Sequence, residues 1–262
     1  MAKTATAVTK AKINLPVDIN AAMQQEVADI QKRISAPSGD RIMITQSKTF
    51  KLPSGEELDE LEAVVVDFAA ANFYYTEAFD RNSITPPVCF ALGLEPAGLE
   101  PSTNSPDKQC DACAGCWANQ FGSAGKGKAC QNTRMLALLA PDADAETPLY
   151  ILKVSPTAIK SFDAHVSKVA SSFQMPVRAV VSKLSFSPDS DYPTLRFNVL
   201  RPAEKDLIML AQNRLEEARK RLLTEPDVSA LKAANDAPPK AKAKAKAPAK
   251  ALPARKAAGG KR

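Results

Sequence analysis

The stretch ELEAVVVDF, residues 60–68, gives the strongest indication of the fold class. Its centre, Ala63 followed by three valines, is β-branched and carries no charge, which is typical of a buried strand. The segment 41–50 also has the composition of a strand, and the turn Pro53-Ser54-Gly55 lies between the two. The sequence therefore predicts a sheet that begins with these two strands.

Further along the chain, the hydrophobic pattern predicts more strands and a prominent helix. Leu195, Phe197 and Val199 alternate with polar residues, as expected for a strand with one apolar face. An apolar stripe at helical spacing runs from Ile159 to Phe173. The expected strands are 134–139, 149–154, 177–187 and 194–200, and the expected helices are 18–34, 157–173 and 202–224.

These elements predict an α+β fold, either an OB-like β-barrel or a strongly twisted sheet, with flanking helices. A Cys-rich metal-binding insertion at 86–133 is expected to separate the second and third strands. The expected domain organisation is a flexible N-terminus at 1–17, an OB-like nucleic-acid-binding domain at 18–225, and a disordered tail rich in Lys, Ala and Pro at 226–262.

The positive charge of the chain is concentrated in that tail. Residues 237–262 contain nine of the 35 Lys and Arg residues and none of the 29 Asp and Glu residues. The formal net charge of +6 therefore hides a slightly acidic body. A polycationic tail attracts polyanions, most commonly nucleic acid, although a merely solubilising tail is the alternative.

The composition also favours a cytoplasmic protein with no membrane partner. No apolar run approaches the length of about 18 residues that a membrane span needs, and the N-terminus lacks the apolar segment of a secretory signal. Cytoplasmic thiols stay reduced. Clustered cysteines in such a protein therefore indicate a metal site or catalysis more often than disulfides.

The segment CDACAGCWANQFGSAGKGKAC, residues 110–130, allows two interpretations. A phosphate-binding P-loop would need a preceding strand, and Ser or Thr after Lys128, where the sequence has Ala129. The P-loop interpretation therefore fails. A metal centre needs four thiolates that converge on a tetrahedron, and a Cys-x2-Cys turn directs two sulfurs to one side.

The five cysteines lie close together in the sequence, which favours the metal interpretation. The predicted ion is Zn²⁺, with an iron–sulfur cluster as the alternative because the first three cysteines of this segment have ferredoxin-like spacing. Four cysteine ligands leave no open position on zinc, so such a site stabilises structure and does not catalyse. His165, the single histidine, is expected to pack. The predicted ligands are Cys89, Cys113, Cys116 and Cys130, with Cys110 as the spare cysteine.

Aromatic and basic side chains lie close to these cysteines in the sequence. Aromatic rings stack on bases, while Lys and Arg contact phosphates. A role in the core is the alternative for any single aromatic residue. The residues predicted to bind nucleic acid are Tyr74, Tyr75 and Trp117 for stacking, and Lys126, Lys128, Arg134 and Arg196 along the backbone.

The segments PPVCFAL, CAGCWANQFGSAGKGKAC and NTRMLALL resemble a group of bacteriophage and prophage proteins encoded among replication and recombination genes. Those proteins share a Cys-x2-Cys-x2-Asn-x2-Gly-Ser motif and a Gly-Lys-Ala-Cys closure. The resemblance covers roughly 40–200 and implies binding of single-stranded DNA, with phage replication or recombination proteins as partners and the bacterial host cytoplasm as location. One departure is the basic C-terminus, because phage and bacterial strand-binding proteins usually end in an acidic tail.

The sequence contains no combination of residues typical of an enzyme active site. We therefore expect a non-catalytic protein, stabilised by zinc, that binds single-stranded DNA. A structural or packaging protein that condenses duplex DNA through its basic tail is the main alternative, and an iron–sulfur enzyme is the third.

Overall fold

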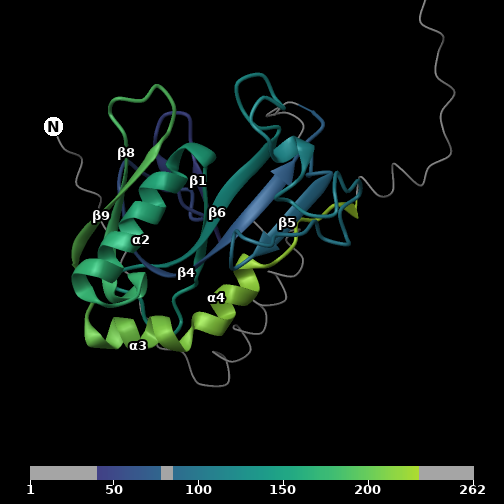
Figure 1. The fold of residues 1–262 in the computed structure, drawn as a ribbon. Coiled ribbons are helices and arrows are strands. Elements are labelled where there is room, and N and C mark those ends of the chain that lie inside the picture. Colours follow the sequence, from purple (N-terminus) through teal and green to yellow (C-terminus); the bar gives the residue numbers. More distant parts are fainter. Residues whose placement is uncertain (1–39, 78–84, 230–262) are drawn as a thin grey trace, which may run out of the picture.

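The computed structural model describes residues 40–77 and 85–229, which form an α+β domain (Figure 1). A strongly curled, half-barrel sheet is combined with helices on both of its faces. The predicted α+β class is therefore confirmed. The expected N-terminal segment 1–17, the helix expected at 18–34 and nearly all of the basic tail lie outside the described residues.

In the part of the chain that the structure describes, the sheet is mixed and has nine strands. β1 and β7 are parallel, and all other neighbours are antiparallel. Curvature brings Phe50 and Phe186, from distant strands, to a ring-centroid distance of 4.6 Å, although no backbone pairing among the described residues closes a barrel. The order is β3 (Glu57–Leu58), β2 (Phe50–Lys51), β1 (Arg41–Ile44), β7 (Tyr150–Val154), β6 (Cys130–Leu139), β4 (Leu61–Tyr74), β8 (Val180–Phe186) and β9 (Leu195–Pro202), and β5 (Cys89–Gly93) also pairs with β4.

β4 is the longest strand, and its two faces pack into different cores. Val64 and Ala69 belong to one core, whereas Val65 and Phe68 belong to the other. Strict alternation would place Phe68 on the same face as Val64. A β-bulge between Val65 and Asp67 exchanges the two faces, because it inserts one residue into the strand.

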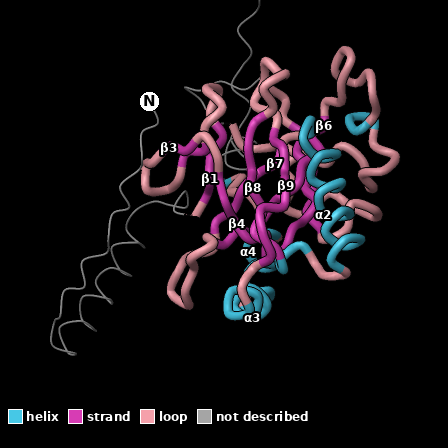
Figure 2. Tube along the Cα trace, turned by 90° about the vertical axis from the view of Figure 1, so that its left-hand side faces the viewer, coloured by secondary structure: helices cyan, strands magenta, loops and turns pink. Residues whose placement is uncertain are grey.

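Helices cover the two faces of the curled sheet separately. α2 (Ile159–Phe173) lies on the concave face, where Phe162 is fully buried in the core that contains Leu136. α3 (Lys205–Asn213) and α4 (Leu215–Leu222) cover part of the opposite face and bury Leu207 and Leu222. Figure 2 shows α2 beside the strands and α3 below them, nearly end-on. The described residues leave part of the face that carries α4 uncovered.

The expected helix at 202–224 is wrong at its start and in its continuity. Pro202 is the last residue of β9, which is an edge strand. Proline is tolerated there because its missing N–H is not needed for a hydrogen bond to the neighbouring strand. The helical segment begins at Lys205 and divides at Arg214. The Arg214 guanidinium binds the carbonyl oxygen of Thr147 and the carboxylate of Glu217, which holds this break in place.

Two further expectations are corrected by the strand pairing. The strand expected at 41–50 is divided into β1 and β2 by a turn, in which the hydroxyls of Thr45 and Thr49 lie 2.7 Å apart. The segment 86–133 is not a simple insertion, because β5 and the first residues of β6 belong to the sheet. Within this segment, residues 86–88 and the connection 94–129 lie outside the strands.

His165 of α2 lies in the core, with 4% of its surface exposed. Its Nε2 atom lies 2.9 Å from the Ser182 hydroxyl of β8, and its ring lies 6.0 Å from that of Phe197. Burial lowers the pKa of His165 below its ordinary value of 6.5, and the charge of Lys168 acts in the same direction. His165 is therefore a packing residue, as the sequence suggested.

This burial predicts an acid-sensitive contribution to stability. The folded state lowers the pKa of His165, so the neutral ring contributes to the free energy of unfolding above pH 6.5. This contribution is lost as the pH falls, because the unfolded chain then binds a proton that the folded core excludes. In His165→Gln, whose amide can still reach Ser182, the free energy of unfolding should fall less over this range. Urea titrations on either side of pH 6.5 measure this difference. Equal pH dependence in both proteins would contradict the assignment.

Candidate functional site

The register of the sheet fixes the positions of two of the predicted ligand cysteines. Cys89 at the start of β5 and Cys130 at the start of β6 both lie opposite Tyr74, at the end of β4. Directly opposed residues of neighbouring strands share a face, so these three side chains lie on one side of the sheet. Because β4 separates the two cysteines, their backbones are about 10 Å apart across three strands.

Cys113 and Cys116 come from the connection 94–129. The amide of Cys113 donates to the Leu99 carbonyl at 2.9 Å, and the amide of Cys116 donates to the Cys113 carbonyl at 3.4 Å. The side chain of Asn119 also donates to the Cys113 carbonyl, at 2.8 Å. These bonds hold the tight Cys-x2-Cys turn against the strand ends and leave both cysteines buried.

Small residues beneath this turn allow it to approach the sheet. Ala70 of β4 and Ala91 of β5 form a small separate core with Leu99 and Cys113. A Cβ atom on Gly93 would lie 2.7 Å from a methyl carbon of Leu99, closer than packed carbons approach. The short side chains in these strands therefore make the room that Leu99 and the cysteine turn occupy.

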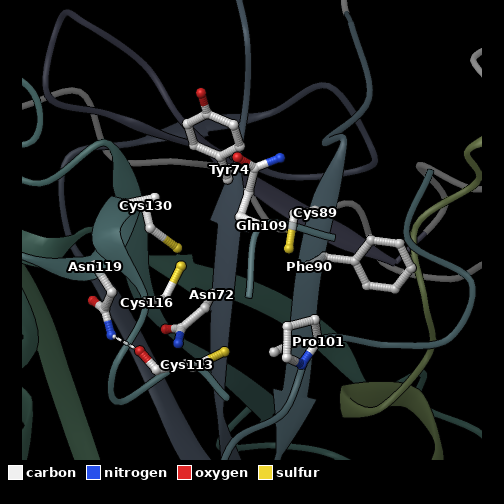
Figure 3. A pocket seen from close by; sticks show the side chains of 12 residues that line it. Asn72, Tyr74, Cys89, Phe90, Pro101, Gln109, Cys113, Cys116, Asn119 and Cys130 are labelled. Carbon is white, nitrogen blue, oxygen red and sulfur yellow. Dashed lines mark hydrogen bonds between the residues drawn. The ribbon is translucent and has the colours of Figure 1, made fainter. Parts of the chain in front are cut away.

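The four predicted ligands line one cavity of about 10 Å³, which Asn72, Tyr74 and Asn119 also line (Figure 3). Cys110, the predicted spare, does not line it. Throughout residues 40–77 and 85–229, no group of three or more His, Cys, Asp or Glu side chains is arranged to hold a metal ion. The thiols therefore share a cavity without forming a coordination shell, and the strand between Cys89 and Cys130 gives a physical reason.

Burial dominates the protonation of these thiols. It raises the pKa of Cys130 to about 12, with the neighbouring cysteines adding to the effect and Lys128 opposing it. Burial also raises the pKa of Cys116, as does a hydrogen bond with Cys110. Burial also raises the pKa of Cys113, although a hydrogen bond with Asn72 acts in the opposite direction and lowers it. These three thiols are therefore neutral at physiological pH in this structure.

Asparagines connect the cysteine turn to the sheet, and sequence analysis missed them. Asn132 of β6 donates to the Asn72 side chain of β4 at 2.7 Å. The Lys128 ammonium lies 3.2 Å from the side-chain oxygens of both Asn119 and Asn132. A buried amide within an apolar strand was the available signal for Asn72. Lys128 thus has a structural role beside the cavity in addition to any contact with phosphate.

Some of the residues predicted to bind nucleic acid lie together beside the cavity. The rings of Tyr74 and Trp117 meet edge to face, with centroids 5.7 Å apart, and 49% of Trp117 is exposed. Phe121, which the sequence analysis did not select, is 81% exposed and lies under the Lys128 ammonium at 5.1 Å. Lys126 is exposed in the same Gly-rich loop. This group forms one basic and aromatic surface.

The other predicted residues do not join this surface. Arg134 forms an ion pair with Asp163 of α2 at 3.2 Å, and Arg196 forms one with Asp189 at 2.8 Å. Tyr75 belongs to the opposite face, where it packs against the core that contains Phe73. The predicted set is therefore divided between separate regions of the domain.

In comparisons with protein-family models, curated proteins and solved structures, none matches this chain. Across the described residues, no helix combines the length and the apolar character needed to cross a membrane. The functional interpretation therefore depends on the residues and their arrangement.

The asparagine network predicts a measurable loss of stability. Asn72→Ala should lower the free energy of unfolding by about 1–3 kcal/mol, because it leaves the partly buried amide of Asn132 without its acceptor. Asn198→Ala is a matched control on an exposed strand position and should change stability by less than about 0.5 kcal/mol. Urea unfolding of both variants tests this, and equal effects would mean that the network contributes nothing.

Proposed function

We propose that this protein binds single-stranded DNA, without catalysis, through the surface beside the cysteine cavity. The observation that carries the proposal is the exposed ring of Trp117, packed against Tyr74, in the same connection between strands that carries Lys126 and Lys128. Aromatic rings in the same segment as lysines suit a single strand, whose bases are free to stack while its phosphates meet the ammonium groups. A duplex offers no unstacked bases to such a surface.

The proposal includes a structural zinc ion held by Cys89, Cys113, Cys116 and Cys130. Four thiols around one cavity form a donor set that suits zinc and leaves no open position for catalysis. The ion would supply a cross-link between β5, β6 and the cysteine turn, and so fix the loop that carries Trp117. Binding would require the sulfurs to draw closer than they are in this structure.

The size of the cavity favours zinc over the alternative iron–sulfur cluster. A volume of about 10 Å³ corresponds to roughly one water molecule. A single ion fits such a space, whereas a cluster of several iron and sulfide atoms would need the turn to move away from the sheet.

An OB-like relationship is also part of the proposal, supported by the strong curl of the sheet and by aromatic residues at the end of its longest strand. A role in phage replication or recombination, with the proteins of those processes as partners in the host cytoplasm, follows from the sequence resemblance. Packaging of duplex DNA by the basic tail is the competing function. A preference for single strands over duplex DNA separates the two.

The first test is metal content. The reduced protein should contain about one zinc ion per chain by elemental analysis, because one set of four cysteines is available. Cys116→Ser should lose the zinc and unfold more easily, whereas Cys110→Ser, changed only outside the cavity, should retain both zinc and stability. Protein free of both zinc and iron would refute the metal centre. Equal damage from the two substitutions would refute this ligand set.

The second test concerns stacking. Trp117 is the only tryptophan, so its fluorescence should be quenched by a bound oligonucleotide. Trp117→Ala should weaken binding of single strands by about 1–3 kcal/mol without loss of fold. Tyr192→Ala is the control, since Tyr192 is a 76% exposed aromatic residue away from the cavity. Unchanged fluorescence at saturation, together with unchanged affinity of Trp117→Ala, would exclude this surface.

A further inference from the structure

A continuous groove lies on the open part of the sheet face that carries α4. Two adjoining hollows, of about 450 and 210 Å³, share Arg41, Met135 and Lys153 as lining residues. Met135 and Lys153 are paired in β6 and β7, and Arg41 lies on the neighbouring strand β1. The groove therefore crosses three strands, on the face opposite to α2 and the cysteine cavity.

Two adjacent cations without acidic partners distinguish this groove. No carboxylate among the described residues pairs with Arg41 or Lys153. Arg221, which also lines the groove, is paired with Asp40 at 2.6 Å and with Glu217 at 2.8 Å. Lys153 is partly buried and Arg41 is exposed beside it, and a partly buried cation without a paired carboxylate favours an anionic ligand.

The aromatic rings around Lys153 remove its ammonium group from water. Its ammonium lies 4.5 Å from the ring centroid of Phe73 and 5.9 Å from that of Tyr75. Burial, followed by the charge of Arg41, lowers the pKa of Lys153 to about 8. The other charged or titratable groups at the groove are Arg41, Arg221 and Tyr75, and burial raises the pKa of Tyr75. Among the acids of the described residues, Asp40 and Glu217 are paired with Arg221, and Glu77 accepts a hydrogen bond from the lining residue Thr85.

The remaining lining residues suit a nucleotide better than a simple anion. Gln131 and Ser155 supply hydrogen-bonding groups, and Met43 and Ile151 supply apolar surface. Tyr75 provides an aromatic ring at the other hollow. The larger hollow falls within the range of about 300–1,000 Å³ that is usual for ligand sites.

We propose that Arg41 and Lys153 bind the phosphate of a nucleoside phosphate, either free or as one unit of a single strand, with Tyr75 available to stack on the base. This second site lies on the other face of the sheet from Trp117. It does not depend on the cysteine cavity or on the surface beside it.

The test measures binding of deoxyadenosine monophosphate and of a short oligo(dT) by calorimetry. Lys153→Met should weaken binding about tenfold or more, since it removes a charged hydrogen-bond donor. Lys160→Met is the matched control, because Lys160 is an exposed lysine on α2, on the other face. Binding of both probes assigns the site to nucleotides in general, and binding of oligo(dT) alone assigns it to a unit of a strand.

A second variant tests the same site without removing its charge. Affinity should fall as the pH rises through about 8, where Lys153 loses its proton, and Lys153→Arg should abolish this fall because a guanidinium stays charged. The proposal is overturned if neither probe binds, or if Lys153→Met binds as the unchanged protein does. Oligo(dT) binding that requires Trp117 but not Lys153 would retain the proposed function and reject this site.

Discussion

The antiparallel pairing of β4 with β6 is the interaction on which the rest of the structure depends. The ladder runs from Val64 opposite Leu139 to Tyr74 opposite Cys130. One end lies in the hydrophobic cores, and the other carries Asn72, Asn132 and Cys130 at the cysteine cavity. A register shift of one residue would turn the cavity residues to the opposite face. The same backbone hydrogen bonds therefore specify both the core and the candidate site.

The bulge in β4 adds a second constraint, because it couples the strand to α4. The extra residue there brings Asp67 to the α4 face, where its carboxylate accepts a hydrogen bond from Arg219 at 3.0 Å. This pair explains a carboxylate within a strand that is otherwise largely apolar. α4 also carries Arg221, whose charge is neutralised by Asp40 and Glu217. Within residues 40–77 and 85–229, no carboxylate pairs with the other two cations of the groove, Arg41 and Lys153.

Features with a local signal could be predicted from the sequence. The valine run of β4 and the apolar stripe of α2 each contain their own periodicity, and the clustering of the cysteines in the sequence indicated that they come together, as the four that line one cavity do. β5 could not be recognised in this way, because its five residues become a strand through pairing with a distant part of β4. The partners of Arg134 and Arg196 likewise come from the fold, as Asp163 and Asp189 show. Of the divisions within the predicted binding set, only one could be predicted from the sequence: Tyr74 and Tyr75 lie on different faces, because consecutive residues of a strand point to opposite sides.

This separation has a consequence for the ligand. Tyr74 and Tyr75 are consecutive, so the surface beside the cysteine cavity and the groove that contains Lys153 meet back to back at the end of β4. A nucleic acid that engaged both sites would turn sharply over this strand end. A single strand can bend within a few nucleotides, whereas a duplex is stiff over about 150 base pairs. If both proposed sites bind nucleic acid, their placement on opposite faces of one sheet would discriminate against duplex DNA without any contact to a base edge.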